Sequence, residues 1–419
     1  MPVMVSSSRT PDYLDDSNYP TTYFRELSPS WLNYVVSLNG TKSVDLQRSF
    51  TYLELGCGHG YSSLIHAAAF PEGTFHACDI NAAYIEAARS RASANVVDNI
   101  HFHNTSFKDL PGQNLPQFDF IVLHGVYSWV DEAVRQEIRA LIRTCLNPGG
   151  LVYVSYNCLP GWSTEVPLRK LLVELARSSE GGTTRQIDHA VRELKRLSNA
   201  GLHYFAVNPS ALDALETYQE SSSGYLSHEF LNETWDPHFS VDVADEMEEA
   251  EVELIGSATL VDNHDPLLVS DSVVQSISEL PTTRLKQLAM DFAVNRQFRR
   301  DVFVHPKSRE PAPAGVLGDV VVGCPGEVET IGATVQVPRG RFSFNTEFIA
   351  ELQRLMQEGS RKLRDVILEL DGGRQSPDVA RNLTYLIAAG ALSPFAETCS
   401  VPEKIETTES TEFTSKSVE

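Results

Sequence analysis

Three glycines at alternating positions, Gly56, Gly58 and Gly60, follow a short apolar stretch in LELGCGHGYSS (53–63). Because glycine has no Cβ, such a turn lets the backbone bend sharply and approach a ligand closely. The dinucleotide fingerprint GxGxxG would require a glycine at position 61, where this chain has Tyr61. That third glycine allows close packing around a pyrophosphate, so its absence argues against NAD as the ligand.

Two acidic residues accompany the glycine turn. Glu54 stands two residues before Gly56, where its carboxylate can hold an ammonium group directly or through water. Asp79, followed by Ile80, ends the apolar stretch GTFHACDI (73–80), where an acid can accept hydrogen bonds from two ribose hydroxyls. The two acids therefore favour a nucleoside ligand that also carries an amino-acid end.

Residues 50–160 alternate short apolar runs with amphipathic helical stretches, which is typical of a parallel sheet built from βαβ units. The predicted strands are FTYLELG (50–56), GTFHACDI (73–80), NIHFHN (99–104), FDFIVLHG (118–125) and LVYVSY (151–156). The predicted helices are YSSLIHAAAF (61–70), AAYIEAARSRAS (82–93) and DEAVRQEIRALIRTCL (131–146). In such a sheet the carboxyl ends of the strands border the ligand crevice, which is where the glycine turn and Asp79 fall.

An acid before a glycine turn, together with an acid that ends the second strand, resembles the class I S-adenosylmethionine-dependent methyltransferases over about residues 50–160. The resemblance implies a Rossmann-like α/β fold and S-adenosylmethionine as the cofactor. The acid that this family carries after strand three is missing from HFHNTSFKDL (101–110). Ser106 and the backbone N–H of Phe107 can bind the adenine edge instead, and the Phe107 ring can stack on it; alternatively, Phe107 is a core residue beneath the loop. The resemblance thus implies a cofactor site made of Glu54, Gly56, Gly58, Gly60, Asp79, Ile80, Ser106, Phe107 and His124.

Two further segments follow strands four and five, LHGVYSWV (123–130) and SYNCLPGW (155–162). The Asp/Asn-Pro-Pro-Tyr motif that DNA and glutamine amide methyltransferases carry after strand four is absent. The two segments after strands four and five instead resemble bacterial methyltransferases that carry a methyltransferase regulatory domain. Three other segments share this resemblance: YLSHEFLNETWDPHF (225–239), NRQFRRDVFV (295–304) and DYLDDSNYPTTYFRELSP (12–29). The outer-membrane-protein lysine methyltransferases belong to that group, and the resemblance spans most of residues 12–305.

The resemblance places the methyl acceptor beside these two segments. Methyl transfer is an in-line displacement at the sulfonium carbon, so the protein mainly aligns the nucleophile. A lysine amine, with an ordinary pKa near ~10.4, must also arrive neutral through desolvation or a nearby base. His124, Tyr127 and Tyr156 are the candidates for that role, and Asn157 can orient the amine.

Aromatic residues near the acceptor allow a cation–π slot for a methylated ammonium, formed by Tyr127, Trp129, Tyr156 and Trp162. The alternative is that Trp129 and Trp162 pack between helix and sheet, and that His124 is a hydrogen-bonded structural histidine.

Composition excludes several classes of function. The net charge is −22, and no long run of Lys and Arg interrupts it, so binding to a nucleic-acid backbone is unfavourable while a cationic acceptor is attracted. No apolar run approaches the ~18 to 20 residues of a membrane span, and MPVMVSSSR lacks the features of a signal peptide. We therefore expect a soluble cytoplasmic protein without a membrane partner.

No metal site is predicted. The six cysteines show no CxxC pairing and no disulfide framework. HEFLN (228–232) begins like the zinc-protease motif HExxH, but Asn232 replaces the second histidine ligand.

The predicted organisation has six parts: an N-terminal lid segment (1–45), an S-adenosylmethionine-binding domain (46–182), a helical regulatory domain (183–305), a linker with a hairpin (306–344), a winged-helix-like domain (345–396) and a disordered acidic tail (397–419). The function expected from the resemblance is N-methylation of a protein lysine. The alternatives are a small-molecule N- or O-methyltransferase and a non-catalytic cofactor-binding module. Neither the number of methyls added nor the oligomeric state is predicted.

Overall fold

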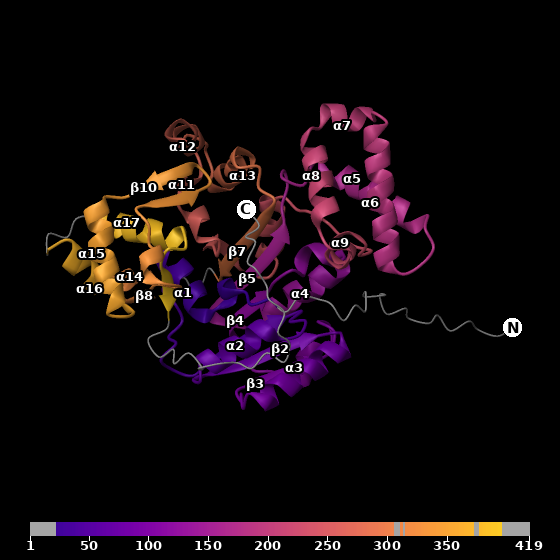
Figure 1. The fold of residues 1–419 in the computed structure, drawn as a ribbon. Coiled ribbons are helices and arrows are strands. Elements are labelled where there is room, and N and C mark those ends of the chain that lie inside the picture. The colour runs from indigo at the N-terminus through magenta and orange to yellow at the C-terminus, as the bar shows by residue number, and fades with distance from the viewer. Residues whose placement is uncertain (1–21, 306–310, 313–314, 373–376, 396–419) are drawn as a thin grey trace.

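A seven-stranded sheet forms the centre of the chain. The structure, a computed structural model, describes residues 22–305, 311–312, 315–372 and 377–395 (Figure 1). The strand order is β3-β2-β1-β4-β5-β7-β6. The strands are β1 (Phe50–Leu55), β2 (Gly73–Asp79), β3 (Ile100–Asn104), β4 (Phe118–Leu123), β5 (Leu146–Asn157), β6 (Glu253–Ser257) and β7 (Phe298–Val304).

Strands β1 to β5 run parallel, whereas β7 runs antiparallel to β5 and to β6. The order 3-2-1-4-5 is that of a doubly wound α/β fold, and the near-continuous apolar strands are buried on both faces, as such sheets require. All five strands predicted for residues 50–160 are present, so the predicted Rossmann-like sheet is confirmed.

Helices cover both faces of this sheet (Figure 1). Alternate strand residues point to opposite faces, so the sheet contributes to two cores. One core joins the sheet to α1 (Pro29–Leu38), α2 (Tyr61–Ala69) and α3 (Ala82–Ala94). The other joins it to α4 (Glu132–Cys145) and α10 (Ser240–Glu248).

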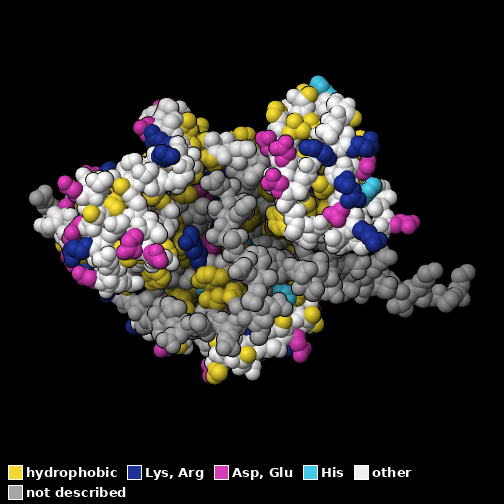
Figure 2. Space-filling view, in the orientation of Figure 1, with side chains coloured by type: hydrophobic (Ala, Val, Ile, Leu, Met, Phe, Trp, Pro, Cys, Tyr) yellow, Lys and Arg dark blue, Asp and Glu magenta, His cyan; other side chains and the backbone are white. Residues whose placement is uncertain are grey.

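Five helices form a lobe with its own core at one side of the sheet (Figure 1). We call it the helical lobe; it contains α5 (Glu165–Arg177), α6 (Thr183–Asn199), α7 (His203–Val207), α8 (Ser210–Glu220) and α9 (Ser223–Phe230). In α6 the buried residues Ile187, Ala190, Val191 and Leu194 recur at spacings of three and four, which gives one apolar face. On the face drawn in Figure 2, basic and acidic side chains are interspersed over the lobe, as on an ordinary solvated surface.

The remainder of the predicted helical domain returns to the sheet. It contains α10, β6, α11 (Asp265–Leu268), α12 (Asp271–Ser278), α13 (Thr283–Ala293) and β7. The helical spacing of TTRLKQLAMDFAVNRQFRRDVF (282–303) suggests one continuous helix, but α13 ends at Ala293. Asn295 adopts a left-handed φ of 48° that ends the helix, and Val302, Phe303 and Val304 are then buried in the sheet.

A smaller unit follows at the opposite side of the sheet from the helical lobe (Figure 1). Its strands are β8 (Val321–Gly323), β9 (Thr334–Val337), β10 (Gly340–Ser343), β11 (Arg361–Lys362) and β12 (Ser393–Phe395). Its helices are α14 (Val316–Asp319), α15 (Thr346–Gln357), α16 (Leu363–Leu370) and α17 (Pro377–Ala388). Within the segment predicted as a linker with a hairpin, β9 pairs with β10, whereas β8 pairs with β11 and β12. The segment predicted as winged-helix-like (345–396) contains α15, α16 and α17.

Two predicted segments lie wholly or partly outside the described residues. These are residues 1–21 of the lid segment and all of the acidic tail (397–419), whereas residues 29–38 of the lid segment form α1, which packs against the sheet. Within the described ranges, no helix combines the length and the apolar character needed to cross a membrane.

Candidate active site

The chain order of the strands reverses between β1 and β4, and ligands of doubly wound sheets bind beyond the carboxyl ends of the strands at such a point. The glycine turn lies there, between β1 and α2. A Cβ at Gly56 would lie 2.6 Å from Cγ2 of Val126, and one at Gly60 would lie 2.5 Å from Cε1 of Phe102. At Gly58, with a φ of 53°, a Cβ would meet no atom within 4 Å. The outer glycines therefore allow protein packing, while Gly58 leaves open space for a ligand.

Asp79 is joined to this turn. Its Oδ2 accepts a hydrogen bond from the N–H of Gly58 over 2.9 Å, and its Oδ1 accepts one from the N–H of Asn81 over 2.9 Å. Burial raises the pKa of Asp79, and these backbone donors oppose that effect. Each oxygen keeps a lone pair for a ribose hydroxyl. The adjacent Ile80 is 50% exposed and can cover an adenine ring.

Glu54 is buried beneath the same turn, with 5% of its surface exposed. Its carboxylate accepts a hydrogen bond from the hydroxyl of Ser63 on α2. Burial raises the pKa of Glu54 to about 7, to which the charge of Asp79 adds. Among the described residues, no lysine or arginine forms an ion pair with Glu54. The ammonium of an amino-acid ligand is a suitable partner for this carboxylate.

The segment after β3 supplies the predicted adenine contacts. The hydroxyl of Ser106 donates to Oδ2 of Asp109 over 2.7 Å and accepts from its N–H, which closes the loop. The ring of Phe107 borders the glycine turn, since a Cβ at Gly56 would lie 3.9 Å from its Cζ. Phe107 also packs against the core on the α4 face. Its position is thus compatible with both interpretations given above, and the adenine contact stays a prediction.

His124 follows β4 and is enclosed by aromatic groups. Its Nδ1 lies 2.8 Å from the hydroxyl of Tyr153, and its ring centroid lies 3.9 Å from that of Phe24 and 6.0 Å from that of Phe298. Burial lowers the pKa of His124 to about 3, and the charge of Arg300 contributes. The imidazole is therefore neutral at physiological pH and is a weak base. Its predicted contacts with cofactor and acceptor remain predictions.

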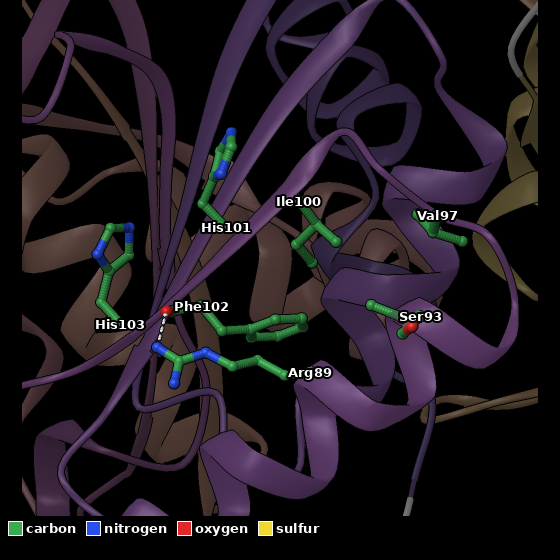
Figure 3. Close-up of a pocket in the computed structure, with 8 residues that line it drawn as sticks. Arg89, Ser93, Val97, Ile100, His101, Phe102 and His103 are labelled. Atoms are coloured by element: carbon green, nitrogen blue, oxygen red, sulfur yellow. Dashed lines mark hydrogen bonds between the residues drawn. The ribbon is translucent and has the colours of Figure 1, made fainter.

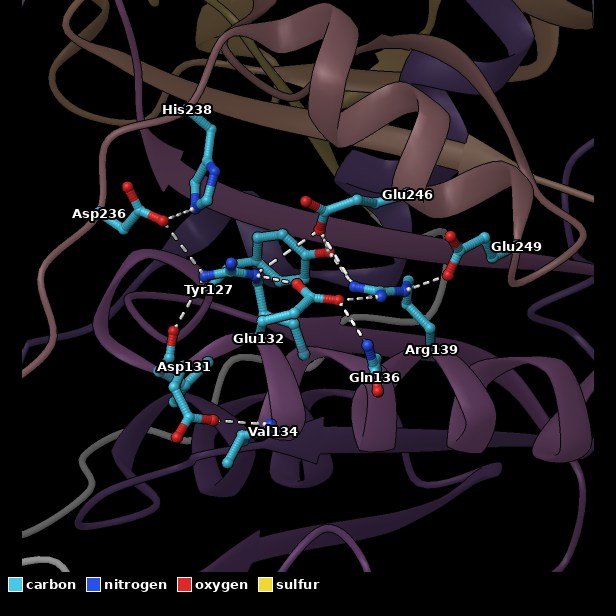
Figure 4. A network of polar contacts seen from close by, with 12 residues as sticks. Tyr127, Asp131, Glu132, Val134, Gln136, Arg139, Asp236, His238, Glu246 and Glu249 are labelled. Atoms are coloured by element: carbon cyan, nitrogen blue, oxygen red, sulfur yellow. Dashed lines mark hydrogen bonds and ion pairs between the residues drawn. The ribbon is translucent and has the colours of Figure 1, made fainter.

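Tyr127 belongs to a polar network between the loop after β4 and α10 (Figure 4). Its ring is fully buried, and its hydroxyl donates to the carboxylate of Glu246. Nη1 of Arg139 lies 3.1 Å from Glu246, while Nη2 lies 2.6 Å from Glu132 and Nε lies 3.0 Å from Glu249. Burial raises the pKa of Tyr127, and the hydrogen bond to Glu246 adds to this. The hydroxyl is thus engaged in holding α10.

Tyr156 is fully buried at the end of β5. Its hydroxyl donates to Oδ2 of Asp301 on β7 over 2.6 Å, and Nε of Arg299 also donates to that carboxylate. Burial raises the pKa of Tyr156 well above its ordinary value. This contact joins the two antiparallel strands, so in this structure the hydroxyl serves packing.

Asn157, the last residue of β5, belongs to the second segment predicted to meet the acceptor and is bonded to the first. Its N–H donates to Oγ of Ser128 over 2.9 Å, and its carbonyl accepts from the N–H of His238 over 2.9 Å. Its Nδ2 is buried and completes no hydrogen bond with the described residues. Of the four predicted catalytic residues, Asn157 has the side chain with an unused polar group.

The aromatic residues proposed for a cation–π slot do not form one group. Trp162 contacts Trp235 edge to face, with ring centroids 5.2 Å apart. Tyr127 and Tyr156 instead flank His238, with centroids at 5.8 and 6.5 Å. Within the described part of the chain, no ring contact joins Trp129 to either group.

Sequence reasoning missed several residues that border the site: Ser63, Phe24, Trp235 and Glu229. Glu229 stood in the rejected HEFLN motif, and Trp235 and Phe24 stood in segments quoted only for their family resemblance. Ser63 could have been suggested by its place on the first turns of the helix that the glycines open.

A separate hollow lies at the β3 edge, between that strand and α3 (Figure 3). Nη2 of Arg89 donates to the carbonyl of Phe102 there over 2.7 Å. Since this hollow faces the outer side of the edge strand and not the β1–β4 switch point, we do not place the reaction in it. The hollow is lined by Arg89, Ala92, Ser93, Val97, Ile100, His101, Phe102 and His103.

Comparison with protein families finds two matches. Residues 53–150 match a methyltransferase domain, and residues 222–305 match a predicted methyltransferase regulatory domain. The sequence-based assignment to the class I methyltransferases with a regulatory domain is thereby confirmed. The second match begins within the helical lobe and continues through α10 to β7.

Comparison with individual proteins finds uncharacterized bacterial proteins among the relatives. An uncharacterized protein of Synechocystis is 38% identical over 295 residues, which are 70% of this chain and 58% of that protein. An uncharacterized protein of Rickettsia prowazekii is 26% identical over 70% of this chain and 52% of its own length. The chain thus spans little more than half of these two relatives.

Solved structures of PKMT2 from Rickettsia typhi match nearly the whole chain. PKMT2 of Rickettsia typhi, in complex with AdoHcy, aligns with a TM-score of 0.70 at 20% identity. The alignment covers 91% of this chain and 78% of that one. The likeness shows a shared fold that includes the helical lobe and the C-terminal unit as well as the sheet.

Proposed function

Since residues 53–150 form a class I methyltransferase domain and residues 222–305 a methyltransferase regulatory domain, we propose that the chain N-methylates a protein lysine with S-adenosylmethionine. Bound S-adenosylmethionine supplies a methyl group on an activated sulfonium, so the protein needs to bind, orient and desolvate the reactants.

The observation that carries the proposal is the arrangement at the ends of β1 and β2. Gly58 leaves open space above the turn, Asp79 keeps lone pairs for ribose hydroxyls, and Glu54 is a buried carboxylate without a described cation. These three features fit a nucleoside with an amino-acid end. The AdoHcy bound to the PKMT2 structure supports the same class of cofactor for this fold.

The acceptor follows from charge and from the surroundings of Asn157. A net charge of −22 attracts a cationic protein substrate. The side-chain amide of Asn157 lies beside the loop after β4, and its oxygen can accept a hydrogen bond from the acceptor ammonium. The regulatory region also borders the acceptor side, since the N–H of Cys158 donates to the carbonyl of Gln297 over 2.7 Å and that of Leu159 to the carbonyl of His238 over 2.9 Å.

The test is transfer of label from methyl-labelled S-adenosylmethionine to bacterial protein and metabolite fractions. We expect label in protein, recovered after hydrolysis as methyllysine, and much less label with Asp79→Ala at the same cofactor concentration. Label only in the metabolite fraction would show a small-molecule methyltransferase. Cofactor binding without transfer to any fraction would show a regulatory module.

A further inference from the structure

The side chain of His124 is held in one orientation after the end of β4. Its Nδ1 lies 2.8 Å from the hydroxyl of Tyr153, a fully buried residue of β5. The Phe24 ring lies against the imidazole with centroids 3.9 Å apart, and the Phe298 ring meets it edge to face at 6.0 Å. An imidazole fixed in this way has one ring nitrogen, Nε2, left for a ligand.

The hydrogen bond between Tyr153 and His124 runs from the hydroxyl to the imidazole. Within the described ranges, Nδ1 of His124 is the acceptor that lies at hydrogen-bond distance from this hydroxyl, and a buried hydroxyl hydrogen is rarely left without an acceptor. Burial raises the pKa of Tyr153 well above its ordinary value, and Ser155 opposes that rise, as a hydrogen-bond donor does. Oγ of Ser155 itself accepts from the N–H of Gly125 over 2.9 Å, so its hydrogen is free for Tyr153.

This direction fixes the tautomer of His124. Burial lowers the pKa of His124 to about 3, so the imidazole is neutral at physiological pH and carries one hydrogen. Since Nδ1 accepts a hydrogen bond, that hydrogen is on Nε2. Nε2 forms no hydrogen bond with the described residues, and the side chain is half-buried, so a ligand can reach it. His124 is thus a neutral hydrogen-bond donor and not a base toward the acceptor amine.

His124 and Glu54 lie at the same side of the sheet. The register of β1 and β4 places His124 on the neighbouring strand, two residues nearer the carboxyl end than Glu54. Glu54 accepts a hydrogen bond from Ser63 on α2. The N–H of Phe24, whose ring covers His124, donates to Oγ of Ser62 on the same helix over 3.0 Å. Because an amino acid carries its ammonium and its carboxylate on one carbon atom, an ammonium at Glu54 requires a carboxylate donor close by.

The positive charge that acts on His124 is engaged with other groups. It belongs to Arg300, whose Nε lies 3.2 Å from Oε1 of Glu26 and whose Nη1 donates to Oγ1 of Thr259 over 3.1 Å. The two acids of the cofactor site offer hydrogen-bond acceptors and no donor. The Nε2–H of His124 is therefore suited to bind a carboxylate at this end of the crevice.

We propose that the Nε2–H of His124 binds the carboxylate of the cofactor's amino-acid end, and that Tyr153 is the positioning residue that holds His124 in the tautomer required for this bond. Glu54 then takes the ammonium of the same amino acid. The inference rests on S-adenosylmethionine as the cofactor and not on the proposed lysine acceptor, because any acceptor would meet the same cofactor.

The tautomer of His124 can be measured directly. Two-bond proton–nitrogen NMR spectra of the full chain with isotope-labelled histidine distinguish a protonated from an unprotonated ring nitrogen, and His124→Gln identifies the signals. We expect the Nε2–H form in the wild-type chain and a mixture of both neutral forms in Tyr153→Phe. The matched control is Tyr218→Phe, which removes a buried hydroxyl bonded to Glu165 over 2.6 Å in the helical lobe and should leave the Nε2–H form intact. The Nδ1–H form in the wild-type chain would overturn the assignment.

Titration calorimetry with two ligands tests the contact with the carboxylate. The ligands are S-adenosylhomocysteine and its decarboxylated form, in which a hydrogen replaces the carboxylate. We expect His124→Phe, which keeps a ring against Phe24, to weaken S-adenosylhomocysteine by about 10- to 100-fold and the decarboxylated form by less than about twofold. Tyr153→Phe should weaken S-adenosylhomocysteine by about 2- to 10-fold, because part of His124 keeps the Nε2–H form. Tyr218→Phe should change neither affinity.

Equal weakening of both ligands by a folded His124→Phe, or no weakening of either, would overturn the carboxylate contact. Circular dichroism and urea unfolding show whether each variant is folded. His124→Gln keeps an N–H near the position of Nε2, so it should bind S-adenosylhomocysteine more tightly than His124→Phe does. If methyl label reaches only metabolites, the proposed function fails while this assignment stands. If methyllysine forms in protein but both ligands respond alike to His124→Phe, only this assignment fails.

Discussion

The backbone N–H of Gly58 donates a hydrogen bond to Oδ2 of Asp79 over 2.9 Å. This bond joins the turn after β1 to the end of β2, so the open backbone and the acid act as one unit. The N–H of Asn81 fixes the other oxygen of the same carboxylate. Because both oxygens are held by rigid backbone donors, the lone pairs offered to a ribose are oriented before the ligand arrives.

Replacing Asp79 should therefore weaken cofactor binding strongly. Asp79→Ala removes the acceptors for two ribose hydroxyls, and charge-assisted hydrogen bonds contribute about 1.5 to 3 kcal/mol, which is ~10- to 100-fold in Kd. Titration calorimetry with S-adenosylhomocysteine measures this change. Asp98→Ala, which changes an exposed acid before β3, is the matched control. Equal affinities of the two variants would show that the ribose lies elsewhere.

Substitutions of two glycines of the turn, Gly60 and Gly58, should affect stability and cofactor binding differently. Gly60→Ala places a methyl group 2.5 Å from the Phe102 ring at a φ of 66°, so it should lower the free energy of unfolding by about 1 to 3 kcal/mol. Gly58→Ala meets no protein atom and should cost less stability but weaken cofactor binding more, since the methyl enters the ligand space. Urea unfolding and calorimetry on both variants check this contrast. A larger loss of stability for Gly58→Ala would contradict it.

Glu54 should make cofactor binding depend on pH. Its pKa is raised from 4.5 to about 7 mainly by burial, so between these pH values the folded chain holds a proton that the unfolded chain has lost. Without cofactor, the free energy of unfolding should fall as pH rises through this window. An ammonium beside Glu54 restores the carboxylate, so binding of S-adenosylhomocysteine near pH 6 should release a proton.

Titration calorimetry in buffers of different ionisation enthalpy measures the number of protons released when S-adenosylhomocysteine binds. Glu54→Gln should abolish the release and flatten the pH dependence of stability. Release that persists in Glu54→Gln would assign the proton to another group.

The parts predicted best from sequence were those that depend on neighbours in the chain. The buried strands show continuous apolar runs, and the turn shows its glycines because a Cβ would clash at Gly56 and Gly60. The strand β7 was missed because FAVNRQFRRDVF continues the helical spacing of the preceding residues. Only pairing with β5 and β6 makes it a strand, and no local pattern reports that pairing.

Side-chain partners distant in sequence were not predictable either. The hydroxyl of Tyr127 meets Glu246, 119 residues away, and that of Tyr156 meets Asp301, 145 residues away. Tyr127 follows strand four and Tyr156 lies in strand five, as the sequence indicates, but the direction of each hydroxyl depends on elements that come later in the chain.

The contact between Tyr156 and Asp301 predicts a structural effect. Tyr156→Phe removes a donor from a buried carboxylate that Arg299 still pairs, so the free energy of unfolding should fall by about 1 to 2 kcal/mol. Cofactor affinity should stay within about twofold of the wild-type value. Urea unfolding measures the free energy of unfolding, and titration calorimetry measures the cofactor affinity. Full stability combined with lost methyl transfer would instead support the catalytic role predicted from sequence.

The network around Arg139 should couple the loop after β4 to α10. Tyr127→Phe removes the donor to Glu246, and Glu246→Gln weakens the acceptor for both Tyr127 and Arg139. Each change should lower the free energy of unfolding by about 1 to 2 kcal/mol, and because the two side chains share one bond, the double variant should lose less than their sum. A double-mutant cycle from urea unfolding should give a coupling energy of about 0.5 to 2 kcal/mol. The control is Glu248→Gln, on the exposed side of α10, which should show no coupling energy to Tyr127→Phe. If the losses of unfolding free energy caused by Tyr127→Phe and Glu246→Gln were additive, the loop and the helix would be held by apolar packing alone.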